Sequence, residues 1–246
     1  MIVGAAVCPG APLLVPGLAP GLLAAVPELA SACARAVATL ADADHVLLLT
    51  SGPRHRDGDG NSGRSTVVFP PGSPVTSAPL GDSQGRPHFD GHLNGPVLAA
   101  GPLPGVGVIV GAALLAAAGV DVPTTAVQVG TDPLAVYPWP GGPVGRVGVL
   151  LVADGSTSRG AGSPGGGHPD AASFDHDLAA ALALGDPDRL GQVAGSGRGS
   201  AVGFDSGPAI AAFTRLTAGS GPASADLLYD GAPFGVGYFC ATWSWR

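Results

Sequence analysis

The sequence predicts an α/β fold: a single three-layer α/β/α domain over residues 1–246, with a mainly parallel central sheet and long irregular loops. Apolar runs at residues 2–8 and 45–50 flank an Ala/Leu-rich segment at residues 22–40, which is the order strand, helix, strand. Continuous rather than alternating apolar runs are typical of parallel strands, because these are buried on both faces. No internal repeat and no break in composition marks a second domain.

The first half of the chain supplies this βαβ unit. The strand at residues 2–8 ends at a Pro-Gly pair, and the helix is expected to begin near Pro27, since proline is tolerated in the first helical turn. Residues 52–105 are polar and irregular, and within them residues 66–69 look like a strand. A loop region of this length in a compact domain is typical of a functional lid or a flexible segment.

The second half predicts further strands and helices. Residues 105–120 carry no charge, and the segment suits a buried element because a membrane span needs about 20 apolar residues. The expected strands cover residues 124–129, 147–153, 226–229 and 236–243, and the expected helices cover residues 174–184 and 208–216, with Asp186 opening a short helix between them.

The composition excludes several classes of chemistry. All 11 basic residues are arginines, so no mechanism that needs a lysine is available, such as a Schiff base or a phosphate-loop lysine. Glu28 is the single glutamate. The net charge of −7 and the scattered arginines argue against nucleic-acid binding, which needs a basic face.

The cysteines and the N-terminal segment bear on the compartment. Cys8, Cys33 and Cys240 lie far apart in the sequence and form no C-x-x-C pair, which predicts neither a disulfide framework nor a zinc knuckle and fits the cytoplasm. Residues 1–27 carry no charge before Glu28, but five prolines interrupt them and no basic residue precedes them. We therefore expect neither a signal peptide nor a membrane span.

Two histidine patterns are candidate metal sites. His55 follows the second strand, at the edge of the sheet where α/β folds bind ligands, although a solvated loop histidine would look the same. His88 and His92 are four residues apart, a spacing at which two imidazoles on one helix face can share a metal. Pro87 and Gly91 argue against a helix there.

A group of carboxylates precedes the helix expected at residues 174–184. Asp170 follows His168 closely and is expected to cap the helix, and Asp175 and Asp177 are expected in its first turn, where they would complement the helix dipole. Helix capping and interaction with the helix dipole therefore explain these carboxylates without a role as metal ligands.

Four segments carry a resemblance to a known family through their order and spacing. They are residues 6–16 (AVCPGAPLLVP), 47–55 (LLLTSGPRH), 149–159 (VLLVADGSTSR) and 229–243 (YDGAPFGVGYFCATW). Together they resemble the subunit-B-like family of class III extradiol ring-cleavage dioxygenases, nearest to a bacterial branch, and more distantly the Memo-type proteins of that superfamily. The likeness covers most of the chain.

The resemblance implies a non-haem Fe(II) site of two histidines and one carboxylate, with a further histidine as acid/base. His55 stands at a metal-histidine position, and Asp230 is the carboxylate nearest to the family's metal glutamate. Gly10 stands where the family commonly has a metal histidine, and Ser158 stands at the acid/base histidine. His92, or alternatively His88 or His168, could be recruited from the long loops to rebuild a site.

Two functions follow from these substitutions. The first is a protein that kept the fold, lost the metal site, and binds a small molecule without ring cleavage. The alternative is an active Fe(II)-dependent dioxygenase, or a related metal-dependent enzyme, on a small aromatic substrate. In addition, the aromatic tail at residues 238–245 predicts either a homo-oligomer interface or a core strand that closes the sheet.

Overall fold

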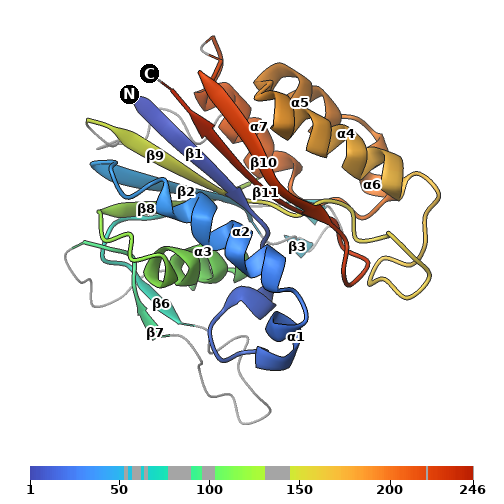
Figure 1. Cartoon of the computed structure of the whole chain (residues 1–246), viewed down its shortest axis with the longest axis horizontal. Coiled ribbons are helices and arrows are strands. Elements are labelled where there is room, and N and C mark those ends of the chain that lie inside the picture. The colour runs from blue at the N-terminus through green and yellow to red at the C-terminus, as the bar shows by residue number, and fades with distance from the viewer. Residues whose placement is uncertain are drawn as a thin grey trace.

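The structure is a computed structural model that describes residues 1–52, 55–56, 62–63, 66–76, 90–95, 103–130, 145–219 and 221–245. At residues 55–56, 62–63 and 91 the description covers the backbone alone. The chain forms an α/β fold with a mixed sheet (Figure 1), so the predicted fold class is confirmed.

Within the described residues the main sheet has seven strands in the order β10-β11-β1-β9-β2-β8-β5. They are β1 (Ile2–Cys8), β2 (His45–Ser51), β5 (Val67–Phe69), β8 (Thr124–Val129), β9 (Val147–Val152), β10 (Ser224–Gly231) and β11 (Tyr238–Ser244). The central strands β1, β9, β2 and β8 are parallel, whereas β11, β10 and β5 pair antiparallel with their neighbours. The predicted mainly parallel centre is therefore confirmed, and antiparallel strands close both edges.

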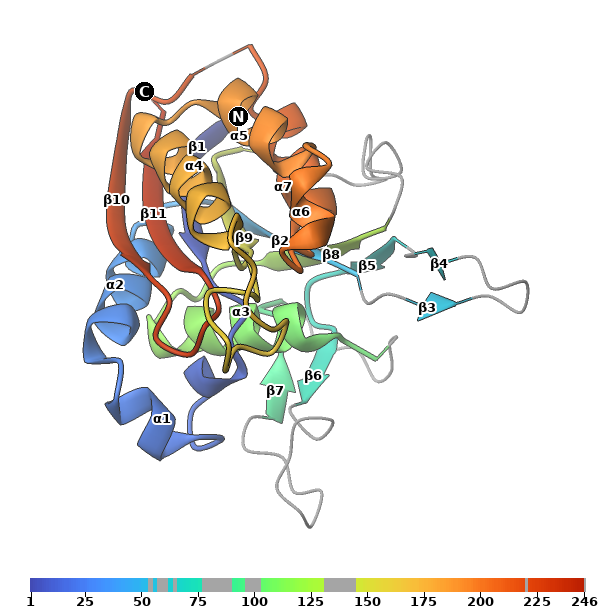
Figure 2. The ribbon, with the colours of Figure 1, turned by 90° about the vertical axis from the view of Figure 1, so that its right-hand side faces the viewer.

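Among the residues that the structure describes, two short strand pairs lie outside this sheet. One joins β3 (His55–Arg56) to β4 (Ser62–Gly63), and the other joins β6 (Pro74–Thr76) to β7 (Asp90–His92). Figure 2 shows β3 and β4 beyond β5, on the side of the molecule away from β10 and β11.

Helices contact both faces of the main sheet. The helical segments are η1 (Pro12–Leu14), α1 (Pro20–Ala24), α2 (Pro27–Ala38), α3 (Val106–Ala117), α4 (Ala171–Leu184), α5 (Pro187–Ala194), α6 (Arg198–Ala201) and α7 (Gly207–Leu216). Alternate residues of a strand point to opposite faces. Accordingly, Ala6 and Cys8 of β1 belong to a buried cluster with α2 and α3, whereas Ala5 and Val7 belong to a separate cluster with α4, α5 and α7.

Most predicted elements lie where the periodicity puts them. The helix that begins at Pro27 is α2, and the uncharged segment forms the buried helix α3. Over the part of the chain that is described, no helix has the length and apolar character needed to cross a bilayer.

The helix-start interpretation of the carboxylates before α4 was wrong. The helix begins at Ala171, earlier than expected, because two alanines with high helix propensity extend it. Asp170 has helical backbone angles and its side chain makes no capping hydrogen bond, and Asp175 lies beyond the first turn. Capping does occur at α5, where Asp186 Oδ1 accepts from the N–H of Arg189 at 2.9 Å.

The aromatic tail forms the internal strand β11 between β10 and β1. Trp243 is 2% exposed, and its Nε1–H donates to the carbonyl of Leu182 in α4 at 2.8 Å. A buried indole with a satisfied N–H is typical of a core position, so the core-strand interpretation of the tail holds for Trp243.

Candidate functional site

A cavity of about 210 Å³ lies at the carboxyl ends of the parallel strands β1, β2 and β9. Its lining is contributed by the ends of these strands, the start of α3 and the loop before α7: Gly10, Thr50, Ser51, Gly52, Val106, Gly107, Val152, Asp154, Asp205 and Ser206. This is the sheet edge at which open α/β folds bind ligands and at which the sequence predicted a site.

Glycines allow the walls of the cavity to approach one another. A Cβ added at Gly107 would overlap the side chain of Thr50, so only glycine lets the first turn of α3 lie this close to β2. A Cβ at Gly10 would lie 3.2 Å from Oδ2 of Asp154 and 3.4 Å from Cγ1 of Val152.

The lining includes two carboxylates, Asp154 and Asp205, and hydrogen bonds connect Asp154 to two other lining residues. Oδ1 of Asp154 accepts from the N–H of Gly10 at 2.9 Å, and its own N–H donates to Oγ of Ser206 at 2.9 Å. Burial raises the pKa of Asp154 from 3.8 to about 6, against the opposing effect of the Gly10 hydrogen bond. A carboxyl group that titrates near neutral pH can accept or donate a proton to a bound molecule.

Two helix N-termini border the cavity. The first residues of α3, Val106 and Gly107, line it, and Ser206 lies immediately before α7. The N–H of Ala209 in the first turn of α7 donates to Oγ of Ser51 at 3.2 Å, which ties α7 to the end of β2. Helix N-termini carry partial positive charge, so both favour electronegative ligand atoms such as hydroxyl oxygens.

The structure does not bring the candidate metal residues His92 and Asp230 together. His92 lies on β7 and lines a second cavity of about 250 Å³ against α3, whereas Asp230 lies on β10, the outer strand of the main sheet. Asp230 is exposed, and desolvation raises its pKa while the charge of Arg159 opposes that rise. The backbone of His55 lies in β3, and its side chain, like the whole of His88, lies outside the described residues.

Ser158 is 2% exposed and is not among the residues that line the Asp154 cavity. Gly10 does line the cavity, but it offers a backbone N–H, which the Asp154 carboxylate already accepts. Across the described lining there is no histidine. These residues therefore do not fit the two-histidine, one-carboxylate Fe(II) set that the family resemblance implies.

A buried carboxylate that contacts the loop after β9 was assigned to the wrong role by sequence reasoning. Asp175 is 0% exposed, and its oxygens accept from the N–H of Ser156 at 2.7 Å, from Oγ of Ser156 at 2.8 Å and from Nη1 of Arg159 at 2.9 Å. It anchors the loop after β9, which also contacts the β10–β11 turn through the hydrogen bond from Gly155 N–H to Gly237 O at 2.7 Å. Asp175 is thus a structural group that holds the loop carrying Asp154 and Ser158.

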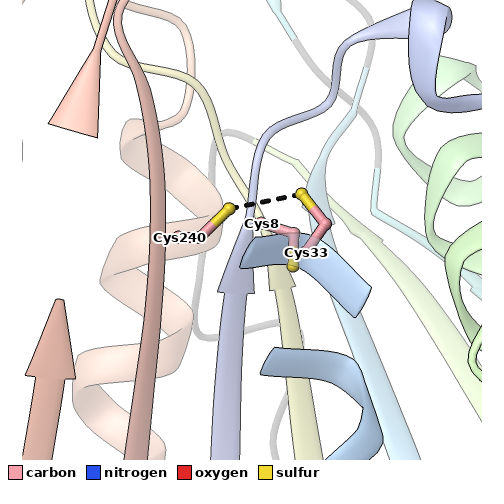
Figure 3. Close-up of side chains that lie close together, drawn as sticks. All are labelled: Cys8, Cys33 and Cys240. Atoms are coloured by element: carbon pink, nitrogen blue, oxygen red, sulfur yellow. Dashed lines mark hydrogen bonds between the residues drawn. The ribbon is translucent and has the colours of Figure 1, made fainter. Parts of the chain in front are cut away.

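The three cysteines that are far apart in the sequence lie together in the fold (Figure 3). Cys8 ends β1, Cys33 lies in α2 and Cys240 lies in β11, and their Sγ atoms all lie within 4.8 Å of one another. Among the described residues this is the one group of His, Cys, Asp or Glu side chains that meets the geometric requirement for a metal ion. No local spacing indicates it, because it depends on the pairing of β1 with β11.

Comparisons with known proteins leave the family unassigned. Neither the protein-family models nor the curated proteins with which the sequence was compared match this chain.

Proposed function

We propose that this chain binds a small hydroxylated molecule in the Asp154 cavity without cleaving an aromatic ring, as an extradiol-dioxygenase-subunit-B-like protein with a degenerate metal site. The observation that supports this proposal most is the hydrogen bond between Gly10 and Asp154. Gly10 follows β1 at the position where the family that this chain resembles commonly has a metal-binding histidine. Gly10 has no side-chain ligand atom, and its backbone N–H already donates to Asp154.

The lining of the cavity suggests the ligand chemistry. Thr50, Ser51 and Ser206 bring hydroxyl groups, Asp154 and Asp205 bring carboxyl groups, and Val106 and Val152 supply apolar surface. A small molecule with an apolar ring and several hydroxyl groups, such as a diphenol, matches this lining. Small-molecule sites typically combine apolar walls with a few polar groups that fix the orientation of the ligand. The volume of about 210 Å³ is below the usual range for drug-sized ligands, which favours a small ring over a larger one.

Binding is tested by following backbone amide NMR signals while catechol or 3,4-dihydroxybenzoate is added. We expect the signals of Gly10, Ser51 and Gly107 to shift, and the shifts to disappear in Asp154→Ala. The matched control is Asp226→Ala, which removes an exposed carboxylate from β10 and should leave the titration unchanged. Shifts that are absent, or that persist in Asp154→Ala, would contradict the proposal.

The alternative, an active Fe(II)-dependent dioxygenase, has one supporting observation. Ser51 and Gly52 line the cavity, and His55 follows three residues later, so the His55 Cα lies within about 11 Å of Gly52. We expect anaerobic loading with Fe(II), followed by catechol and O₂, to give no ring-cleavage product. Ring cleavage that is lost in His55→Ala would establish the alternative instead.

A further inference from the structure

We propose that Cys8, Cys33 and Cys240 form a binding site for a single soft metal ion, Cu(I) in particular, held by three sulfur atoms and separate from the Asp154 cavity. Cys8 comes from the end of β1, Cys33 from α2 and Cys240 from β11. The three side chains point toward one another in the apolar layer between the sheet and α2 (Figure 3). All three are 0% exposed.

The distances suit a metal more closely than a disulfide. The Sγ atoms of Cys33 and Cys240 are 3.2 Å apart, and all three cysteines are free. A metal–sulfur bond of about 2.3 Å in a planar three-sulfur arrangement separates the sulfurs by about 4 Å. Because the three Sγ atoms already lie within 4.8 Å of one another, side-chain shifts of under about 1 Å would admit the ion.

The donor set selects the kind of metal. All three donors are sulfur, and no carboxylate oxygen or imidazole nitrogen of a described residue joins the group. Soft thiolate ligands favour Cu(I) over hard ions such as Mg²⁺ and Ca²⁺, which require oxygen. Zn²⁺ prefers four ligands, and burial of the cluster leaves little room for water as the fourth. Three-coordinate Cu(I) fits this donor number.

Contacts among the three sulfur atoms shift the pKa values of the cysteines in different directions. Hydrogen bonds with Cys240 and then with Cys8 lower the pKa of Cys33. The same contacts raise the pKa of Cys8, in which the hydrogen bond with Cys240 is the largest cause, and the hydrogen bond with Cys33 raises that of Cys240. One Cu⁺ bound by three thiolates takes the place of the protons that the sulfurs carried, and those protons are released to solvent.

This balance predicts that the affinity for Cu(I) falls as the pH is lowered, because protons compete for the same sulfurs. The product carries negative charge in an apolar layer. Arg35 of α2, whose charge lowers the pKa of Cys240, offsets part of that charge.

The test is an anaerobic competition between the full, reduced chain and a chromophoric Cu(I) chelator such as bicinchoninate. We expect one Cu(I) per chain, and X-ray absorption of the complex should show three sulfur ligands at about 2.3 Å. Cys33→Ala and Cys240→Ala should each weaken binding by at least ~100-fold, since two sulfurs remain. Asp154→Asn keeps all three sulfurs and should bind as the unmodified chain does, which separates this proposal from the cavity ligand.

Three outcomes would overturn the assignment. They are the absence of any competition with the chelator, binding that survives in both alanine variants, and a tetrahedral Co(II) spectrum together with Zn(II) displacing Cu(I). Circular dichroism checks that each variant folds. If Cys33→Ala does not fold, Cys8→Ser preserves the side-chain volume and carries the same expectation of at least ~100-fold weaker binding.

Discussion

Asp175 illustrates, at the scale of a residue, how a buried charge holds a functional loop in place. Its carboxylate accepts three hydrogen bonds from Ser156 and Arg159, and added Cβ atoms at Gly155 or Gly237 would meet its oxygens at close range. The side chain is fully buried while Arg159 is 26% exposed, so the carboxylate depends on these donors for its solvation.

We expect Asp175→Asn to destabilise the protein by about 2–4 kcal/mol, since the amide offers one acceptor oxygen to donors that need two and leaves Arg159 without its counter-charge. Urea unfolding measures the change. The matched control is Asp177→Asn on the same helix, where the pair with Arg198 at 2.8 Å is solvent-exposed and is expected to contribute at most about 1 kcal/mol. An equal decrease in the free energy of unfolding in the two variants would refute a structural role for Asp175.

The second prediction at the scale of a residue concerns Asp154 and the pH dependence of the stability of the fold. Its pKa is about 6 in the folded chain against 3.8 for the unperturbed group, so the folded state holds the proton more tightly. The stabilisation that protonation gives is complete below about pH 4 and is lost as the pH rises through 6. Asp154→Asn does not titrate, and we expect its stability relative to the unmodified chain to rise by about 2–3 kcal/mol between pH 4 and 7.5. Urea unfolding at several pH values tests this, and a pH-independent difference would contradict it.

At the scale of an element, α3 is placed by its glycines. Gly107 and Gly111 lie on the face of α3 that meets β2, where added Cβ atoms would overlap Thr50 and Leu48 respectively. This close packing sets the position of the α3 N-terminus at the cavity. The uncharged sequence of α3 predicted a buried element, but which strand it meets depends on the sheet order.

We expect Gly111→Ala to destabilise the protein by about 1–3 kcal/mol, because overpacking against Leu48 outweighs the gain of up to about 1 kcal/mol in helix propensity. Gly21→Ala in α1 is the control, since nothing lies within 4 Å of an added Cβ there and the substitution should be neutral or slightly stabilising. Thermal unfolding of both variants distinguishes the two cases. A stabilised Gly111→Ala protein would show that α3 is not held by this contact.

At the scale of the whole molecule, β11 joins the outer strand β10 to the parallel centre. Trp243 packs against Phe213 of α7, with ring centroids 5.2 Å apart, and Trp245 lies 6.2 Å from Trp243. Because these aromatic contacts lie within the chain, we expect Trp245→Ala to leave the molar mass in light scattering unchanged. A lower mass would favour the interface interpretation of the tail.

The sequence by itself determined the α/β class, the parallel central strands and the sheet edge at which a cavity opens, since continuous apolar runs and proline or glycine at their ends are local signals. Only the tertiary structure decided that Asp175 is buried, that His92 and Asp230 lie apart, and that Cys8, Cys33 and Cys240 converge. These facts depend on strand order and helix packing, which bring together residues as distant in the sequence as Cys8 and Cys240. The periodicity of apolar residues cannot predict such contacts, because it shows which face of a helix or strand is buried and not which element packs against that face.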